Sequence, residues 1–253
     1  MRFTNKCVLV TGAGSGIGRA TCLAFAKEGA AIGAADVNLE AAQSTVYEVE
    51  KSGCKAVALQ VDVAVPESVA AMVTHAVERL GGIDVLVNSA GVREIVPFLL
   101  LPFAEWQRIL SVNLTGTFLC SQAVAQYLVT HGRGGKIVNL ASVAGLTAVP
   151  NRAAYVSSKH AVVGLTKEMA LELADKNIQV NAVAPGVVRT SMTESYFDKP
   201  DVLEGLKKAH PAGRWALPEE IAPLIVFLAS PEADFITGAT FPIDGGFMAG
   251  KGL

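Results

Sequence analysis

Cysteine is scarce in this 253-residue sequence, and its four copies, Cys7, Cys22, Cys54 and Cys120, include no Cys-x-x-Cys pair. Scattered cysteines are typical of a reduced compartment, so we expect no disulfide framework and no zinc cluster. The four histidines show no metal-binding spacing either, and we predict no metal site. The net charge is small too: 21 Lys and Arg residues against 23 Asp and Glu residues leave a net charge of -2. This balance argues against nucleic acid as a partner.

Long hydrophobic runs are absent, although hydrophobic residues make up 51% of the chain and the mean hydropathy is +0.41. The longest stretch without Lys, Arg, Asp or Glu, residues 109–132, is interrupted by polar side chains, so no continuous apolar run reaches the roughly 18 residues that a membrane span requires. The first residues show no apolar leader and no small-residue cleavage signal, so we expect a cytoplasmic protein with no membrane partner. No linker, charge block or internal repeat interrupts the chain, which predicts a single domain over residues 1–253.

Short runs rich in valine, isoleucine and alanine indicate strands at residues 7–11, 31–35, 56–61, 85–88, 136–140 and 179–184. Longer segments with helical spacing lie between them. Because these strands are apolar at nearly every position, both of their faces should be covered, as in a parallel sheet between two layers of helices. The alternation predicts a doubly wound α/β fold of the Rossmann type. The stretch at residues 190–213 breaks this pattern, and we interpret it as a candidate substrate flap.

A glycine-rich segment, Thr-Gly-Ala-Gly-Ser-Gly-Ile-Gly at residues 11–18, follows the first strand. Glycines allow a tight turn that brings the amides of a helix N-terminus against a phosphate, so the segment predicts a pyrophosphate-binding loop. The spacing differs from G-x-G-x-x-G because Ile17 stands where the last glycine would fall. The candidate contacts in this loop are Gly12, Ser15, Gly16, Ile17 and Gly18.

Asp36 closes the second strand about 20 residues beyond the glycines, where a carboxylate can accept hydrogen bonds from an adenosine ribose. The same carboxylate would repel a 2′-phosphate, and no Lys or Arg stands beside it, so NAD is favoured over NADP as the cofactor. Small and polar residues also end the next two strands, at the edge where such folds bind ligands. These further candidates for cofactor contact are Asp62, Val63, Asn88, Ala90 and Gly91.

A serine, a tyrosine and a lysine supply the candidate chemistry. Ser142 follows the fifth strand, and Tyr155 and Lys159 are four residues apart in a segment with helical character. That spacing places both side chains on one helical face, where an ammonium group would favour the ionised phenol. A free tyrosine titrates near pH 10, so a lowered pKa would suit Tyr155 to proton transfer in neutral solution.

In this order, the motifs resemble the short-chain dehydrogenase/reductase family in its compact single-domain branch. The likeness spans essentially the whole chain. It also includes Asn113 in Val-Asn-Leu-Thr-Gly, the pair Pro185-Gly186 and the terminal Ile-Asp-Gly-Gly at residues 243–246. The resemblance implies a mostly parallel sheet of seven strands with helices on both faces. It also implies a homotetramer with 222 symmetry, in which helices near residues 103–127 and 153–174 pack across one two-fold axis and the C-terminal strand lies at another.

The resemblance further implies roles for individual residues. Tyr155 would be the acid/base, Ser142 would orient the substrate oxygen, and Lys159 would hold the nicotinamide ribose while lowering the tyrosine pKa. Asn113 would support a water-linked proton relay to Lys159. The nicotinamide end of the cofactor would be contacted by Pro185, Gly186, Val188 and Thr190.

The resulting hypothesis is an NAD-dependent oxidoreductase that interconverts a small-molecule secondary alcohol and its ketone. Two alternatives stay open: an NADPH-dependent 3-oxoacyl thioester reductase, and a dinucleotide-binding sensor that catalyses nothing. By family resemblance, the short interval between Tyr155 and Lys159 favours carbonyl chemistry over enoyl reduction. Glu94 could receive a hydroxyl or amine of the substrate, unless it is a solvated loop carboxylate. The remaining candidates for substrate contact, beside Ser142 and Tyr155, are Thr147, Val149, Val187 and Met192.

Overall fold

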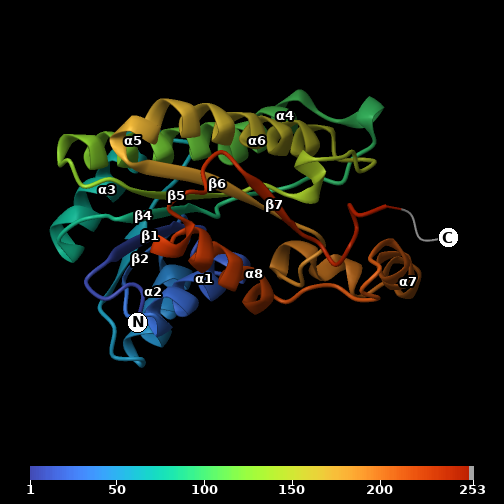
Figure 1. Ribbon diagram of the computed structural model, residues 1–253. Coiled ribbons are helices and arrows are strands. Elements are labelled where there is room, and N and C mark those ends of the chain that lie inside the picture. Colours follow the sequence, from blue (N-terminus) through green and yellow to red (C-terminus); the bar gives the residue numbers. More distant parts are fainter. Residues whose placement is uncertain (251–253) are drawn as a thin grey trace.

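Seven parallel strands form one sheet in the computed structural model, which describes residues 1–250 (Figure 1). The strands are β1 (Cys7–Thr11), β2 (Ala31–Asp36), β3 (Ala56–Gln60), β4 (Val85–Asn88), β5 (Gly135–Leu140), β6 (Ile178–Pro185) and β7 (Thr240–Ile243). Their spatial order is β3-β2-β1-β4-β5-β6-β7, and every neighbouring pair runs parallel. The predicted doubly wound α/β fold is therefore confirmed. Strand β7 shows no apolar run because it is a partly exposed edge strand that contains Pro242.

Helices cover both faces of the sheet (Figure 1). They are α1 (Gly16–Lys27), α2 (Leu39–Glu50), α3 (Pro66–Leu80), α4 (Phe103–Leu110), α5 (Gly116–Thr130), α6 (Ala153–Leu173), α7 (Pro200–Ala209) and α8 (Pro218–Leu228). Helices α1, α2 and α8 lie on one face, and α3, α4, α5 and α6 lie on the other. The helical segment expected near residues 103–127 runs without a break from α4 into α5 through a π-helical turn at Ser111–Thr115.

Alternate side chains of the strands enter two separate cores, one on each face of the sheet. In β1, Val8 and Val10 pack with Phe25 of α1 and Ile221 of α8, whereas Leu9 packs in the opposite core. Successive strand residues point to opposite faces, so a strand that is buried on both sides must be apolar throughout. This double burial explains the continuous apolar runs in the sequence.

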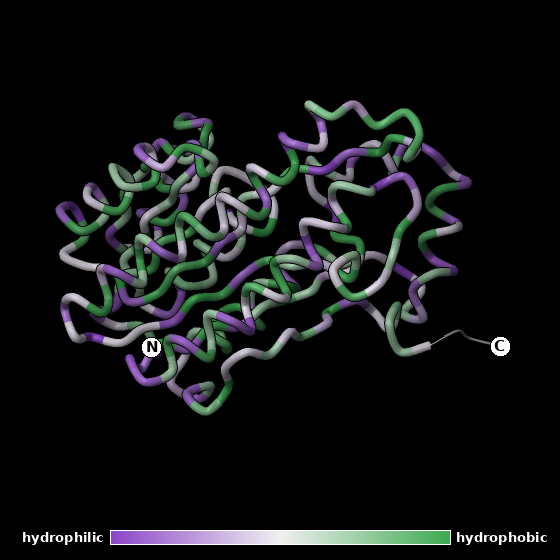
Figure 2. Tube along the Cα trace, turned by 90° about the horizontal axis from the view of Figure 1, so that it is seen from above, coloured by the Kyte–Doolittle hydropathy of each residue, from purple (hydrophilic) through white to green (hydrophobic). Residues whose placement is uncertain are grey.

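The carboxyl ends of the strands share one edge of the sheet, where hydrogen bonds tie neighbouring loops together. The buried hydroxyl oxygen of Thr11, at the end of β1, accepts hydrogen bonds from the backbone N–H groups of Ser89 (3.2 Å) and Ala90 (3.3 Å) beyond β4. The candidate flap beyond β6, which contains the 3-10 helix Ser191–Tyr196 and α7, lies at this end of the molecule (Figure 2). Among residues 1–250, no helix is both long and apolar enough to cross a membrane.

Candidate active site

A cavity of about 930 Å³ opens at the carboxyl edge of the sheet. Its wall brings together the loops that follow the first six strands, and its volume falls within the usual range of cofactor and small-molecule sites. The predicted site residues on this wall are Gly12, Ser15, Gly16, Ile17, Gly18, Asp36, Asp62, Val63, Ala90, Gly91, Glu94, Ser142, Tyr155, Lys159, Pro185, Gly186, Val188, Thr190 and Met192.

The glycine positions in the loop between β1 and α1 leave no room for a side chain. Gly12 and Gly16 have φ angles of 64° and 52°, in the left-handed region that glycine enters without strain. A Cβ atom on Gly18 would lie 2.1 Å from the carbonyl oxygen of Gly12. The side chain of Ser15, the N-cap of α1, makes no capping hydrogen bond, which leaves the first N–H groups of the helix for a ligand. The loop therefore fits a pyrophosphate group.

Asp36 stands at the end of β2, and the backbone holds both of its carboxylate oxygens. Oδ2 accepts a hydrogen bond from the N–H of Gly14 (2.9 Å), and Oδ1 accepts one from the N–H of Asn38 (3.0 Å). No Lys or Arg of residues 1–250 forms an ion pair with this carboxylate. An uncompensated negative charge fixed beside the glycine loop fits a ribose diol and disfavours a 2′-phosphate.

Ser142, Tyr155 and Lys159 meet on the part of the wall formed by the end of β5 and the start of α6. Nζ of Lys159 donates a hydrogen bond to the carbonyl oxygen of Leu140 (2.6 Å) and lies 5.7 Å from the centre of the Tyr155 ring. The side chain of Ser142 acts on the Tyr155 phenol and favours its ionised form. Helical spacing thus brings the tyrosine and the lysine to one end of the cavity, which we call the substrate end.

The pKa of Tyr155 moves in the direction opposite to the expected one. Burial raises the pKa of its phenol, and the side chain of Ser142 and the charges of Arg93 and Arg152 offset this increase only in part. Burial also lowers the pKa of Lys159 to about 8, because the ammonium group loses its hydration. Desolvation dominates the pKa of Tyr155, and the main opposing charges are those of Arg93 and Arg152, so a lowering of the tyrosine pKa by Lys159 stays a prediction.

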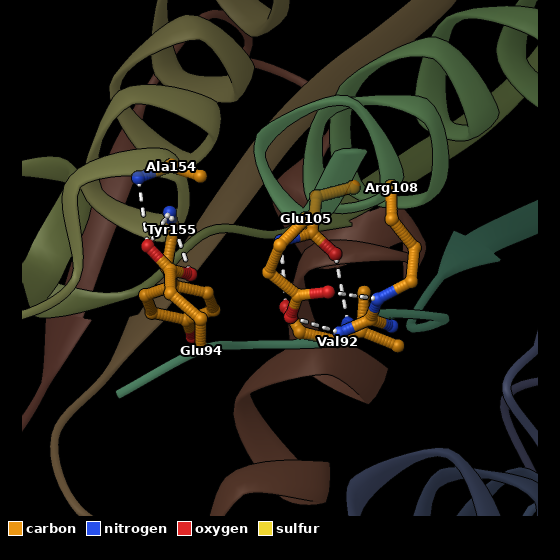
Figure 3. A network of polar contacts seen from close by, with 7 residues as sticks. Val92, Glu94, Glu105, Arg108, Ala154 and Tyr155 are labelled. Carbon is orange, nitrogen blue, oxygen red and sulfur yellow. Dashed lines mark hydrogen bonds and ion pairs between the residues drawn. The ribbon is translucent and has the colours of Figure 1, made fainter. Parts of the chain in front are cut away.

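Glu94 is buried, with 4% of its surface exposed, and it caps helix α6 (Figure 3). Its Oε1 accepts a hydrogen bond from the N–H of Ala154 (2.7 Å), and the N–H of Tyr155 lies 3.2 Å from each carboxylate oxygen. A carboxylate at a helix N-terminus satisfies free N–H groups and interacts favourably with the helix dipole. The interpretation of Glu94 as a solvated loop carboxylate is therefore wrong. Any contact of Glu94 with substrate would compete with this capping role.

Asn88 and Asn113 lie behind the cavity wall and not on it. Nδ2 of Asn88 donates hydrogen bonds to the hydroxyl of Ser121 (2.8 Å) and to Oδ1 of Asn139 (2.9 Å). Asn113, in the π-helical turn, accepts from the N–H of Val92 (2.8 Å) and donates to its carbonyl oxygen (2.9 Å). Both side chains stabilise the sheet edge and the loop beyond β4, and neither is exposed to the cavity.

Three predicted substrate contacts also lie off the main cavity. Thr147 and Val187 do not line it, and Val149 lines a second cavity of about 210 Å³ instead. The N–H of Val187 donates a hydrogen bond to Nε2 of His210 (3.3 Å), which ties the loop beyond β6 to the end of α7. Among residues 1–250, no group of three His, Cys, Asp or Glu side chains is placed to hold a metal ion.

Arg93, Arg152 and Tyr196 form a cluster that no sequence motif indicates. Both guanidinium groups donate hydrogen bonds to the hydroxyl oxygen of Tyr196, and Arg93 also lines the main cavity. The three residues come from three separate segments of the chain. The one local signal is the position of Arg152, three residues before Tyr155 and one residue before α6 begins.

Sequence comparison places the chain among known oxidoreductases. A family model described as Enoyl-(Acyl carrier protein) reductase matches residues 12–248. Cyclohexanol dehydrogenase of Acinetobacter sp. strain SE19 is 40% identical over 249 residues, which cover 98% of this chain and 97% of that protein. The 3-oxoacyl-(acyl-carrier-protein) reductase of Thermotoga maritima is 41% identical over 248 residues, which cover 98% of this chain and 100% of that protein.

Solved structures share the fold. A short-chain type dehydrogenase/reductase from Mycobacterium marinum has a TM-score of 0.93 at 38% identity, with 98% of this chain and 97% of that chain covered. A protein from Agrobacterium tumefaciens, assigned as a 2-deoxy-D-gluconate 3-dehydrogenase and solved with bound NADP, has a TM-score of 0.92 at 36% identity, with 98% of each chain covered. This protein is an oxidoreductase that binds a nicotinamide dinucleotide, as its fold, its cavity and these relatives together indicate. The chain belongs to the short-chain dehydrogenase/reductase family.

Proposed function

We propose that this protein is an NAD-dependent oxidoreductase that interconverts a secondary alcohol and its ketone. The observation that carries the proposal is that Ser142, Tyr155 and Lys159 share one cavity with the glycine loop and Asp36. A nicotinamide dinucleotide bound there would exchange a hydride with the substrate carbon. The residues of the chain would position the two reactants and handle the proton.

Tyr155 is the acid/base in this proposal, and Ser142 orients the substrate oxygen next to it. A phenol whose pKa is raised by burial is protonated at neutral pH, so it can donate a proton to the oxygen of a ketone that is being reduced. Alcohol oxidation needs the phenolate and should become faster as the pH rises. Lys159, whose ammonium group donates a hydrogen bond to the carbonyl oxygen of Leu140, would bind the nicotinamide ribose in this proposal.

NAD is the proposed cofactor because of the carboxylate at Asp36. Its two oxygens are fixed by backbone N–H groups beside the glycine loop, with no positive side chain paired to them among residues 1–250. The Agrobacterium tumefaciens relative was solved with NADP. The shared fold therefore does not decide between NAD and NADP, and the residues of each chain must be considered. In this chain the fixed negative charge supports NAD.

A 3-oxoacyl thioester reductase is the second candidate, and its support is the 41% identity with the Thermotoga maritima enzyme. The relatives assigned to cyclohexanol and 2-deoxy-D-gluconate support alcohol oxidation instead. The two candidates differ in cofactor and in substrate. Turnover of a panel of sugars, polyols, hydroxy acids, cyclic alcohols and acyl thioesters, measured with both cofactors, separates them. A clear preference for NADPH with acyl thioesters would favour the second candidate.

Tyr155→Phe tests the proposed acid/base directly, because it removes the hydroxyl and keeps the ring. We expect turnover to fall by about 100- to 10,000-fold, the usual contribution of a general acid or base. The affinity for NADH, measured by fluorescence titration, should stay nearly unchanged. Tyr47→Phe, at a tyrosine that is 61% exposed on α2, is the matched control. Unchanged turnover in Tyr155→Phe would remove this residue from the mechanism.

We also propose that the protein assembles as a homotetramer through α4, α5 and α6. Large apolar side chains are exposed on all three helices, with Phe103 71%, Phe118 41% and Leu171 83% exposed. Exposed apolar side chains of this size gain free energy when a partner removes them from water.

A further inference from the structure

Two arginines converge on one phenol beside the substrate end, where Arg93 lines the main cavity and Arg152 lines the second cavity. Arg93 lies in the loop after β4, Arg152 immediately precedes α6, and Tyr196 ends the 3-10 helix of the flap. Both guanidinium groups donate hydrogen bonds to the hydroxyl oxygen of Tyr196. The guanidinium carbons of Arg93 and Arg152 lie 4.4 Å and 5.8 Å from the centre of the Tyr196 ring. Three separate segments therefore hold two cations around one uncharged group.

The two positive charges have no carboxylate partner within residues 1–250. Neither Arg93 nor Arg152 takes part in an ion pair there. Their other hydrogen bonds go to backbone carbonyl oxygens, that of Met192 for Arg93 and that of Pro150 for Arg152 (3.0 Å). Two like charges held close together repel each other, and an anion between them would relieve that repulsion.

The neighbouring charges leave this end of the cavity positive. Glu94 is buried, but its carboxylate is engaged by the N–H groups at the start of α6. Arg108, which also lines the cavity, is paired with Glu105 at 2.7 Å. The positive charges of Arg93, Arg152 and Lys159 outnumber the one carboxylate of Glu94, which favours an anionic group on the substrate.

The cluster lies within electrostatic range of the proposed acid/base. Arg93 lines the same cavity as Ser142 and Tyr155, and the charges of both arginines act on the Tyr155 phenol. Guanidinium groups bind carboxylates through paired, charge-assisted hydrogen bonds. The Tyr196 hydroxyl oxygen marks a point that both guanidinium groups reach at once, and a bound carboxylate oxygen would replace this hydroxyl as their shared acceptor.

We propose that the substrate is a hydroxy acid, or the corresponding oxo acid, whose carboxylate is bound by Arg93 and Arg152 while its reacting oxygen contacts Tyr155. This inference rests on the proposed alcohol and ketone chemistry and names its substrate class. The carboxylate takes no part in the bond changes. On oxidation, the hydroxyl proton goes to the Tyr155 phenolate, and the hydrogen on the carbinol carbon leaves with its electron pair to the oxidised nicotinamide.

Matched pairs of compounds test the role of the charge. Each pair contains a hydroxy monocarboxylate and its methyl ester, and the series moves the hydroxyl stepwise along the carbon chain. Turnover with NAD is followed by nicotinamide absorbance. We expect kcat/KM to be about 10- to 100-fold higher for the acid than for its ester in the best pair, the range set by hydrogen bonds to a charged group. A ratio near 1 in every pair that turns over would overturn the inference.

Variants of the two arginines then test which residues cause the preference for the acid over its ester. Arg93→Gln and Arg152→Gln should bring the ratio of kcat/KM for the acid to kcat/KM for its ester toward 1. Retained turnover of the ester would show that the variants fold. Arg93→Lys keeps the charge and should keep part of the preference. Arg108→Gln is the matched control, because Arg108 lines the same cavity but is already paired, and its ratio should stay at the wild-type value. Equal losses for acid and ester in the Arg93 and Arg152 variants would show a structural role and contradict the inference.

The outcomes also separate this inference from the proposed function. Turnover of neutral alcohols without any preference for acids would overturn the inference and leave the proposed function standing. If no compound turns over, the Tm measured with NAD and the same hydroxy acids decides. A rise in the Tm of the wild-type protein that is lost in Arg93→Gln would support carboxylate binding, and no rise in the wild-type Tm would refute it. Tighter binding of phosphorylated alcohols than of hydroxy acids would refute the assignment to a carboxylate.

Discussion

Replacing Glu94 by glutamine tests whether this buried carboxylate holds the start of α6 in place. Glutamine keeps one oxygen that can accept from the N–H of Ala154, but it loses the charge and turns an N–H₂ group toward backbone donors. A carboxylate at a partly buried helix N-terminus contributes up to about 2 kcal/mol. We expect Glu94→Gln to lower the free energy of unfolding by about 1–2 kcal/mol, which for a chain of this length lowers Tm by about 2–8 °C.

Thermal unfolding and steady-state kinetics together decide the role of Glu94. Glu67→Gln is the matched control, because Glu67 is exposed in the first turn of α3 and should change stability by less than about 0.5 kcal/mol. In Glu94→Gln, kcat should fall along with Tm, since Tyr155 lies in the first turn of α6, which the carboxylate caps. An unchanged Tm combined with a raised KM for substrate would refute this reasoning. That result would make Glu94 a substrate contact.

Three further predictions concern the cofactor, pH and assembly. Asp36→Ala should lower the preference for NADH over NADPH in kcat/KM by about 10-fold or more, because it removes the repulsion of a 2′-phosphate. The free energy of unfolding of wild type, measured by chemical denaturation relative to Lys159→Met, should rise by about 3 kcal/mol between about pH 8 and about pH 10.5. The reason is that the unfolded chain binds the Lys159 proton more tightly across that pH range. A difference between the two proteins that does not change with pH would contradict the buried ammonium group. Wild type should have the mass of a tetramer by light scattering, and Phe103→Glu should shift it toward smaller species; a monomeric wild type would refute the proposed assembly.

Much of the fold could be predicted because its signals are local. A strand that is buried on both faces is apolar throughout, as in β4, and the bend between β1 and α1 requires glycine at Gly12 and Gly16. The four-residue interval between Tyr155 and Lys159 places both side chains on one face of any helix. Strand β7 was harder to predict from an apolar run, because its edge position relaxes the requirement for apolar residues.

Contacts between distant segments had no comparable signal. The burial of Glu94 depends on how the loop after β4 packs against the start of α6, about sixty residues later. The convergence of Arg93, Arg152 and Tyr196 depends equally on where the flap lies. Charge and polarity in the sequence suggested a solvated carboxylate and gave no indication of the arginine pair, because a residue type does not specify which distant groups will surround it.

The sequence by itself determined the elements, their alternation and the positions of the reactive groups along them, since each of these follows from spacing over a few residues. Tertiary structure alone decided which way the pKa of Tyr155 moves, because the loss of hydration depends on every segment that packs around the phenol. It also decided which charges surround the reacting oxygen. Electrostatic effects depend on distance through space, and distance along the chain does not predict them.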